Sequence, residues 1–164
     1  MFAALLTFPG AASARGMDEQ RFLAVFFQLH EAMPDLANVE AMLTGNGYRL
    51  VSRETNDGKS TVEYSNSEQN LFLICEKKIY PGLATDVQYT ASLYDTDATF
   101  ADNLRTLMND HMGAEAVPFD DNPGWQAMAW PGQDGTEQVA FSVSHNEEHQ
   151  VTRIWGHKVL VGDK

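Results

Sequence analysis

The chain has 164 residues, of which 43% are apolar and 10% aromatic. This composition supports a packed core and excludes an intrinsically disordered chain, and the length suits one domain of ordinary size. With 23 acidic and 11 basic residues the net charge is −12. Such a charge repels nucleic acid and anionic lipid and favours a basic protein or a cationic ligand as partner.

The N-terminus resembles the end of a secretory signal peptide. Residues 1–8 are uncharged and mostly apolar, Pro9-Gly10 breaks the run, and Ala12-Ser13-Ala14 supplies a cleavage sequence of small residues. No Lys or Arg precedes the apolar run, so the peptide would be truncated at its start. We expect a periplasmic or secreted protein, with residues 15–164 as its single domain. Translation from Met17 is the alternative and would give a cytoplasmic protein. Beyond the leader, no apolar run approaches the length that spans a bilayer.

Three helices are predicted. The first runs from Asp18 to Met33, because apolar residues recur there at helical spacing and Pro34 follows. A second, shorter helix is capped by Asp35 and ends at Gly45-Asn46-Gly47. A third follows the capping residue Asp97. The apolar stripe of the first helix contains Phe22, Val25, Phe26, Leu29 and Met33, and that of the third contains Phe100, Leu104, Leu107, Met108 and Met112.

The remaining segments favour strands. Asn56-Asp57-Gly58 is typical of a tight hairpin, and Val87, Tyr89, Ala91 and Leu93 alternate with polar residues. The expected strands are 48–54, 61–65, 70–77, 87–93, 125–130, 139–143 and 151–161. The sequence therefore predicts an α+β domain, with an antiparallel sheet of about six or seven strands and all three helices packed on one face.

Most of the negative charge lies in one segment. Twelve carboxylates occur from Asp86 to Glu148, where Arg105 is the only basic residue. The segment would attract a cationic partner, or it would serve solubility as a solvated face. The candidate binding residues in it lie in the loop predicted over 114–124, at the start of the strand that follows, and in a hairpin turn: Phe119, Asp120, Asp121, Trp125, Glu147 and Glu148.

Two histidines fall inside apolar stripes of helices. His30 lies between Phe26 and Leu23 on the first helix, and His111 lies within the stripe of the third. If these helices pack side by side, the imidazoles could meet or face one pocket as catalytic or ligating groups. The alternative is a hydrogen-bonded histidine at the edge of the core, or, for His111, a cation at a helix C-terminus.

His145 and His149 are weak metal candidates, with His157 further along the last strand. Imidazole and carboxylate are transition-metal ligands, but a spacing of four residues brings side chains together on a helix and not in a hairpin turn. We therefore expect an exposed polar turn there. Asp95-Thr96-Asp97 resembles the start of a calcium loop but lacks its glycine and its final glutamate.

The single cysteine, Cys75, allows no internal disulfide. It lies in the apolar run 71–75, where we expect a strand buried on both faces and an inert thiol, the alternative being a reactive thiol. No nucleophile, phosphate-binding or dinucleotide motif is present, so no catalytic residue and no cofactor are predicted. Aromatic residues on strands, among them Trp125, Trp130 and Trp155, could form a ligand-binding sheet face, although such residues more often belong to the core.

In outline, the chain resembles the small acidic α/β chaperones of bacterial secretion systems. The shared features are a leading helix, a meander of three strands, a helix and further strands, and the chain lacks a predicted terminal helix. We expect an exported, non-catalytic binding module that engages a basic partner. The alternatives are a cytosolic chaperone or adaptor beginning at Met17, as the resemblance implies, and a metal-dependent enzyme or metal-binding protein.

Overall fold

The computed structural model describes residues 17–119, 122–130 and 137–161. The predicted leader (residues 1–14), Asp120 and Asp121 lie outside the described residues. The described elements are α1 (Glu19–Ala32), α2 (Leu36–Gly45), β1 (Arg49–Asn56), β2 (Lys59–Asn66), β3 (Leu71–Tyr80), β4 (Ala84–Tyr94), α3 (Ala98–Met112), β5 (Val117–Phe119), β6 (Trp125–Trp130), β7 (Glu137–Asn146) and β8 (Val151–Val161).

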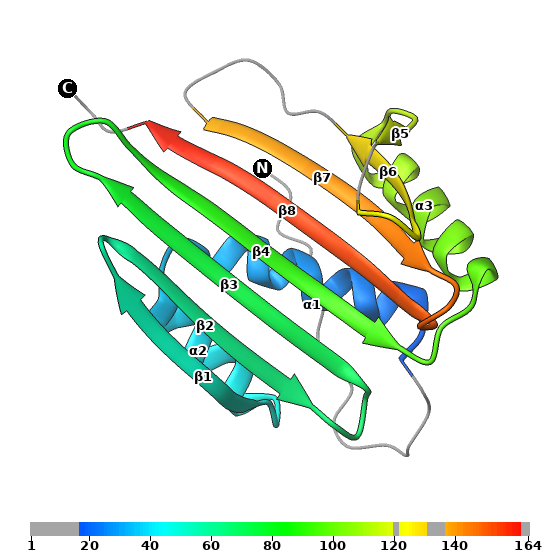
Figure 1. Ribbon diagram of the computed structural model, residues 1–164, viewed down its shortest axis with the longest axis horizontal. Helices are drawn as coiled ribbons and strands as arrows, with labels where there is room; N and C mark the ends of the chain where they lie inside the picture. The colour runs from blue at the N-terminus through cyan, green and yellow to red at the C-terminus, as the bar shows by residue number, and fades with distance from the viewer. Residues whose placement is uncertain (1–16, 120–121, 131–136, 162–164) are drawn as a thin grey trace.

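The strands form one antiparallel sheet in the order β1-β2-β3-β4-β8-β7-β6-β5 (Figure 1). The long strands β4 and β8 pair at its centre, from Ala84 opposite Val161 to Tyr94 opposite Val151. The sheet has eight strands, where six or seven were predicted, because Val117–Phe119 pairs with β6 inside the segment that was predicted to be a loop. The α+β class and the antiparallel sheet are otherwise as predicted.

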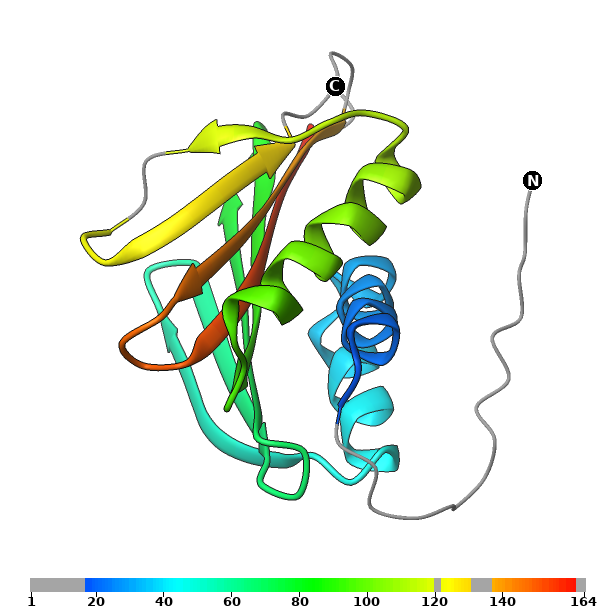
Figure 2. The same cartoon turned by 90° about the vertical axis from the view of Figure 1, so that its right-hand side faces the viewer.

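All three helices cover the same face of the sheet (Figure 2). The core lies between them and this inner face, and it contains Phe22, Phe26 and Leu29 of α1, Leu104 and Met108 of α3, and inward side chains of the strands. None of the helices in the described segments is both long enough and apolar enough to cross a membrane. The opposite face of the sheet carries no helix (Figure 1).

Local sequence signals set the ends of several elements. Asp18, Asp35 and Asp97 accept hydrogen bonds from backbone N–H groups at the starts of α1, α2 and α3, as side chains at the N-cap position do. Asp57 and Gly58 both have positive φ, 47° and 76°. Two such residues make the tight turn that matches the twist of a hairpin, which explains why Asp-Gly predicted the β1–β2 hairpin correctly.

The absence of a side chain at Gly156 allows close packing at the centre of the sheet. A Cβ atom on Gly156 would lie 2.4 Å from Cε2 of Tyr89. Tyr89 is fully buried, and its hydroxyl is hydrogen-bonded to Nδ1 of His30 on α1. The missing side chain on β8 therefore leaves the space in which the Tyr89 ring lies across the inner face and contacts α1.

Candidate functional site: the uncovered face of the sheet

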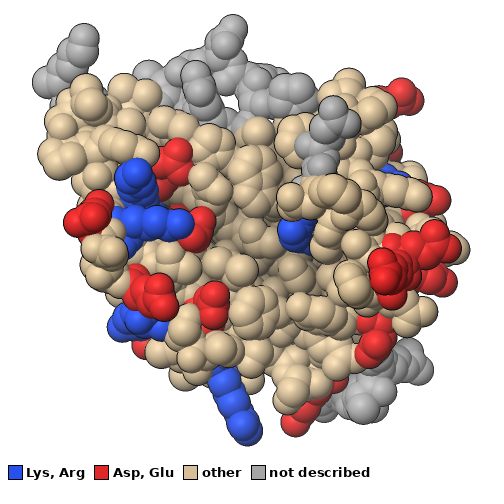
Figure 3. All heavy atoms as spheres, viewed as in Figure 1, with Lys and Arg blue, Asp and Glu red and all other residues tan. Residues whose placement is uncertain are grey.

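The outer face, as we call it, consists of the strand side chains that point away from the helices. Over residues 71–76 of β3 and 87–93 of β4, side chains alternate between buried and half-buried, because one face meets the helices and the other does not. The antiparallel register places Ile74, Thr90, Trp155 and Ser142 in one row across four strands, and Phe72, Ser92, Arg153 and Ser144 in the next. Figure 3 shows that the centre of this face carries few charged side chains.

A strip of stacked side chains follows β8 along the outer face. The Arg153 guanidinium lies over the Trp125 ring at 4.1 Å, and its Nε donates a hydrogen bond to the Ser144 hydroxyl. Trp155 stacks on His157 with their ring centroids 5.6 Å apart. His157 Nε2 lies 3.1 Å from a carboxylate oxygen of Asp86. We call Trp125, Arg153, Trp155 and His157 the β8 strip.

A hollow of about 220 Å³ opens beside this strip. Trp155 and Arg153 line it from β8, Thr90 from β4 and Ser142 from β7, and Phe119 of β5 lines it with Asn122. Its walls therefore combine two aromatic rings with hydroxyl and amide groups and the Arg153 guanidinium. A cleft of mixed lining beside exposed aromatic rings can hold a side chain of a partner.

Unpaired carboxylates lie at one end of the outer face. Glu147 and Glu148 form the exposed turn between β7 and β8, directly after Asn146, which pairs with Trp125 of the β8 strip. Neither glutamate makes an ion pair with a residue that the structure describes. In Figure 3 acidic side chains gather along this margin of the molecule. The aromatic centre of the outer face therefore has an acidic border.

The structure brings most of the predicted binding residues together. Phe119 is 50% exposed and lines the hollow, Trp125 belongs to the β8 strip, and Glu147 and Glu148 follow Asn146 in the neighbouring turn. Asp120 and Asp121 lie outside the described residues. The predicted loop and the predicted turn are thus close in space, although more than twenty residues separate them in the sequence.

The two helical histidines do not meet. His111 is exposed, and its ring packs against Phe27 with centroids 4.1 Å apart and the ring planes tilted by 35°. Phe27 in turn contacts His30 edge-on. An aromatic ring therefore separates the two imidazoles, while His30 is hydrogen-bonded to Tyr89 below it. His30 therefore lies hydrogen-bonded at the edge of the core, while His111 lies exposed in the last turn of α3, and the two imidazoles do not face one pocket.

The expectation of an exposed polar turn fails for His145. Its side chain is 3% exposed and lies on the inner face, where Nδ1 is 3.0 Å from the Thr152 hydroxyl. His149 is exposed, so the two imidazoles are not on one surface. No group of three or more potential metal-ligating His, Cys, Asp or Glu side chains occurs among the described residues. His145 is buried because side chains alternate along β7, which places His145 on the same face as Val143.

Cys75 is fully buried on β3, and this burial raises the pKa of its thiol to about 12. A neutral, inaccessible thiol is a poor nucleophile. The prediction that its strand is buried on both faces was wrong in one respect. Phe72 and Ile74, on the outer face of the same strand, are only half-buried, because no helix covers them.

Sequence reasoning missed Arg153 as a site residue and left Trp155 as either core or surface. Period-two alternation groups Trp155 with Arg153 on one face of β8, and a charged residue on that face is the signal that it points outward. The sequence could thus have assigned Trp155 to the polar face. Comparisons with protein-family models, curated proteins and solved structures found no match for this chain.

Proposed function

We propose that this protein is a non-catalytic binding module whose outer face takes a basic polypeptide segment. The observation that carries the proposal is the combination of an uncovered, aromatic sheet face with unpaired carboxylates at its margin. An apolar side chain of the partner occupies the hollow beside Trp155, and its Lys or Arg residues lie against Glu147 and Glu148.

The two parts of this surface have different physical roles. Aromatic side chains that are half-exposed before binding become buried on contact, and such rings supply much of the affinity of protein interfaces. Exposed carboxylates contribute little once they are paired in water, but they steer a cationic partner towards the site and exclude acidic ones. The stacked Arg153 presents its planar group at the centre and limits where a positive charge of the partner can lie.

The place of action is part of the proposal. The leader-like N-terminus supports an exported protein, and the outline shared with secretion chaperones supports a cytosolic adaptor. N-terminal analysis of the protein from its native host separates the two. A mature start at Arg15 supports export, and a start at Met17 supports the adaptor.

The test is a binding measurement with defined peptides. Two series of peptides of equal length are used, each peptide containing a single Leu or Trp. The basic series has Lys and Arg at the other positions, and the acidic series has Asp and Glu. Each peptide is titrated into the protein (residues 15–164) in a calorimeter. We expect binding of the basic series only. Trp155→Ala should weaken it about tenfold or more, as loss of a central aromatic contact does.

The matched control is Tyr80→Ala, which removes an aromatic ring that is 41% exposed at the β3–β4 hairpin. Tyr80 lies on the same side of β3 as Ile74 but at the end of the strand, and it does not line the hollow. This variant should bind as wild type does. Equal binding of basic and acidic peptides, or equal losses in the two variants, would contradict the proposal.

A further inference from the structure

A second, smaller hollow lies on the helix side of the molecule. It has a volume of about 110 Å³ and is lined from α1, the end of α2, the start of β1 and the β2–β3 turn. A water molecule needs about 10–15 Å³ on the same measure, so there is room for several waters or for a short organic molecule. Met17, Val25 and Leu43 provide its apolar lining.

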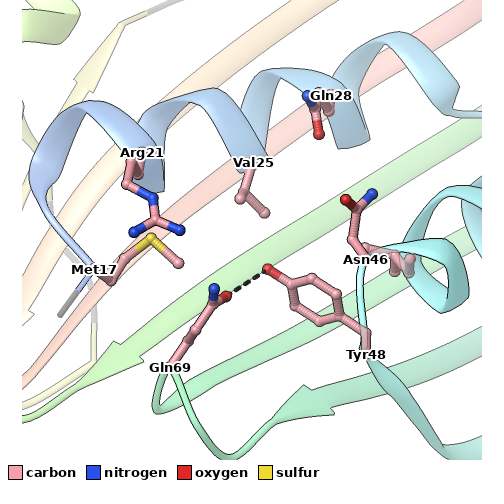
Figure 4. A pocket seen from close by; sticks show the side chains of 8 residues that line it. Met17, Arg21, Val25, Gln28, Asn46, Tyr48 and Gln69 are labelled. Carbon is pink, nitrogen blue, oxygen red and sulfur yellow. Dashed lines mark hydrogen bonds between the residues drawn. The ribbon is translucent and has the colours of Figure 1, made fainter. Parts of the chain in front are cut away.

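Hydrogen-bond donors converge at one end of this hollow (Figure 4). The Arg21 guanidinium points towards Gln69 and the Tyr48 hydroxyl in that view. Tyr48 is 6% exposed, and its hydroxyl donates one long hydrogen bond, 3.4 Å, to the Gln69 amide oxygen. Burial raises the pKa of Tyr48 to about 12, against an opposing effect of the Arg21 charge. The phenol therefore keeps its proton at neutral pH and remains a donor.

The charge of this hollow differs from that of the rest of the molecule. Arg21 is the only charged residue among the side chains that line it. It makes no ion pair with any residue in the described ranges. An unpaired guanidinium beside a buried phenol is suited to hold a carboxylate, because it offers paired donors in a planar fork.

The other end of the hollow offers acceptors. The Asn46 amide nitrogen donates to the Met42 carbonyl oxygen at 2.7 Å, which leaves the Asn46 side-chain oxygen available. Gln28 lies across from it on α1 (Figure 4). A ligand hydroxyl or amide N–H could be satisfied at this end, while the ligand carboxylate is held at the other.

We propose that this hollow binds a short organic carboxylate that carries a hydroxyl or amide group, with Arg21, Tyr48 and Gln69 around the carboxylate and Asn46 and Gln28 at the far end. The site is separate from the outer face, since it lies between the helices and one end of the sheet. The protein would then bind a small molecule at this site in addition to the polypeptide segment that we propose for the outer face.

The experiment is an amide-resolved NMR titration of the wild-type chain with glycolate, acetate, acetamide and inorganic phosphate. We expect saturable shifts at Arg21, Gln28, Asn46, Tyr48 and Gln69 with glycolate, weaker binding of acetate, and none with acetamide. Loss of a charge-assisted pair costs about tenfold or more, so Arg21→Gln should weaken glycolate binding by that factor. Tyr48→Phe should weaken it less.

Arg49→Gln is the matched control, because Arg49 is exposed on β1 and does not line the hollow. It should bind glycolate as wild type does, as should Trp155→Ala, which tests the outer face alone. The proposal is overturned if glycolate gives no saturable shifts, if Arg21→Gln binds it as wild type does, or if acetamide or phosphate binds as tightly.

Discussion

The position of the Tyr89 side chain depends on the absence of a side chain at Gly156. The Tyr89 ring occupies the space that any Cβ on residue 156 would need, and it is held there by Phe26 and by the hydrogen bond to His30. Moving a tyrosine enclosed in this way costs free energy, because protein interiors are packed at the density of organic crystals.

Gly156→Ala should therefore lower the free energy of unfolding by about 1–3 kcal/mol, the usual cost of overpacking a core. Chemical denaturation measures it. Gly45→Ala is the control, since nothing lies within 4 Å of the added Cβ at the end of α2. That variant should be neutral or slightly more stable. A Gly156→Ala protein as stable as wild type would show that Tyr89 is free to shift.

Buried phenol and thiol groups, Tyr48 and Cys75 among them, make the stability of the protein depend on pH in the alkaline range. The pKa values of Cys75 and Tyr48 are raised to about 12 from 9.0 and 10.0. In the unfolded chain both groups lose protons at lower pH than in the folded protein. The unfolded state then binds fewer protons, so the free energy of unfolding falls as the pH rises from 9 towards 12.

Tyr48→Phe should remove the part of this decline that begins near pH 10. Denaturation curves at several alkaline pH values measure the effect. In the same range Cys75 should resist a thiol reagent until the protein unfolds. A slope that is unchanged in Tyr48→Phe, or rapid labelling of the folded protein, would contradict the assigned burial.

Among the elements, α1 contributes most directly to the packing between the helices and the sheet, through Phe26. Phe26 is fully buried and contacts Phe27, Tyr89 and Phe141, with ring centroids 5.3 to 5.8 Å apart. Replacing a buried Phe by Ala leaves a cavity as well as losing transfer energy. The helix was predicted as Asp18 to Met33 and is observed as Glu19–Ala32 with Asp18 as its cap.

Phe26→Ala should cost about 3–5 kcal/mol of stability. Phe119→Ala removes the same side chain from a position that is 50% exposed and should cost far less. Thermal unfolding of the two variants gives the comparison, and similar losses in both would refute the assignment of Phe26 to the core.

The elements could be predicted where a local rule applies. Asp-Gly at residues 57–58 requires a tight turn, and the aspartates before the helices satisfy free N–H groups. β5 escaped prediction because it has three exposed residues, includes Pro118, and exists only through pairing with β6. The uncovered outer face was not predicted for a related reason. Alternation and the charge of Arg153 place Trp155 on the polar side of its strand, but the sequence does not show that all the helices leave this side uncovered, because that depends on packing over the whole chain.

At the scale of the whole molecule, charge is distributed unevenly along the strands. The carboxylates of the β7–β8 turn lie at the end of the sheet where Tyr94 pairs with Val151. The lysines of the described segments lie towards the other end of the strands: Lys59, Lys77, Lys78 and Lys158. This asymmetry orients a basic partner towards Glu147 and Glu148 before contact.

Replacing both Glu147 and Glu148 by Gln should slow association with a basic peptide, and more so at low salt, because exposed charges are screened beyond about 8 Å at physiological ionic strength. Stability should hardly change. Stopped-flow association rates measure the effect. The control, Glu31→Gln with Asp57→Asn, makes the same change of charge on exposed residues outside this turn and should have the smaller effect. Equal slowing by the two pairs would mean that net charge alone is responsible.

Mapping where a basic peptide binds tests most directly whether the outer face is the binding surface. Amide shifts are recorded while a Lys-rich peptide with one Trp is titrated into the protein. We expect the largest changes on the outer face, at Thr90, Ser142, Arg153 and Trp155, and at the Glu147–Glu148 turn. Changes centred on the helices, or none at saturating peptide, would contradict the claim that the uncovered face of the sheet is the binding surface.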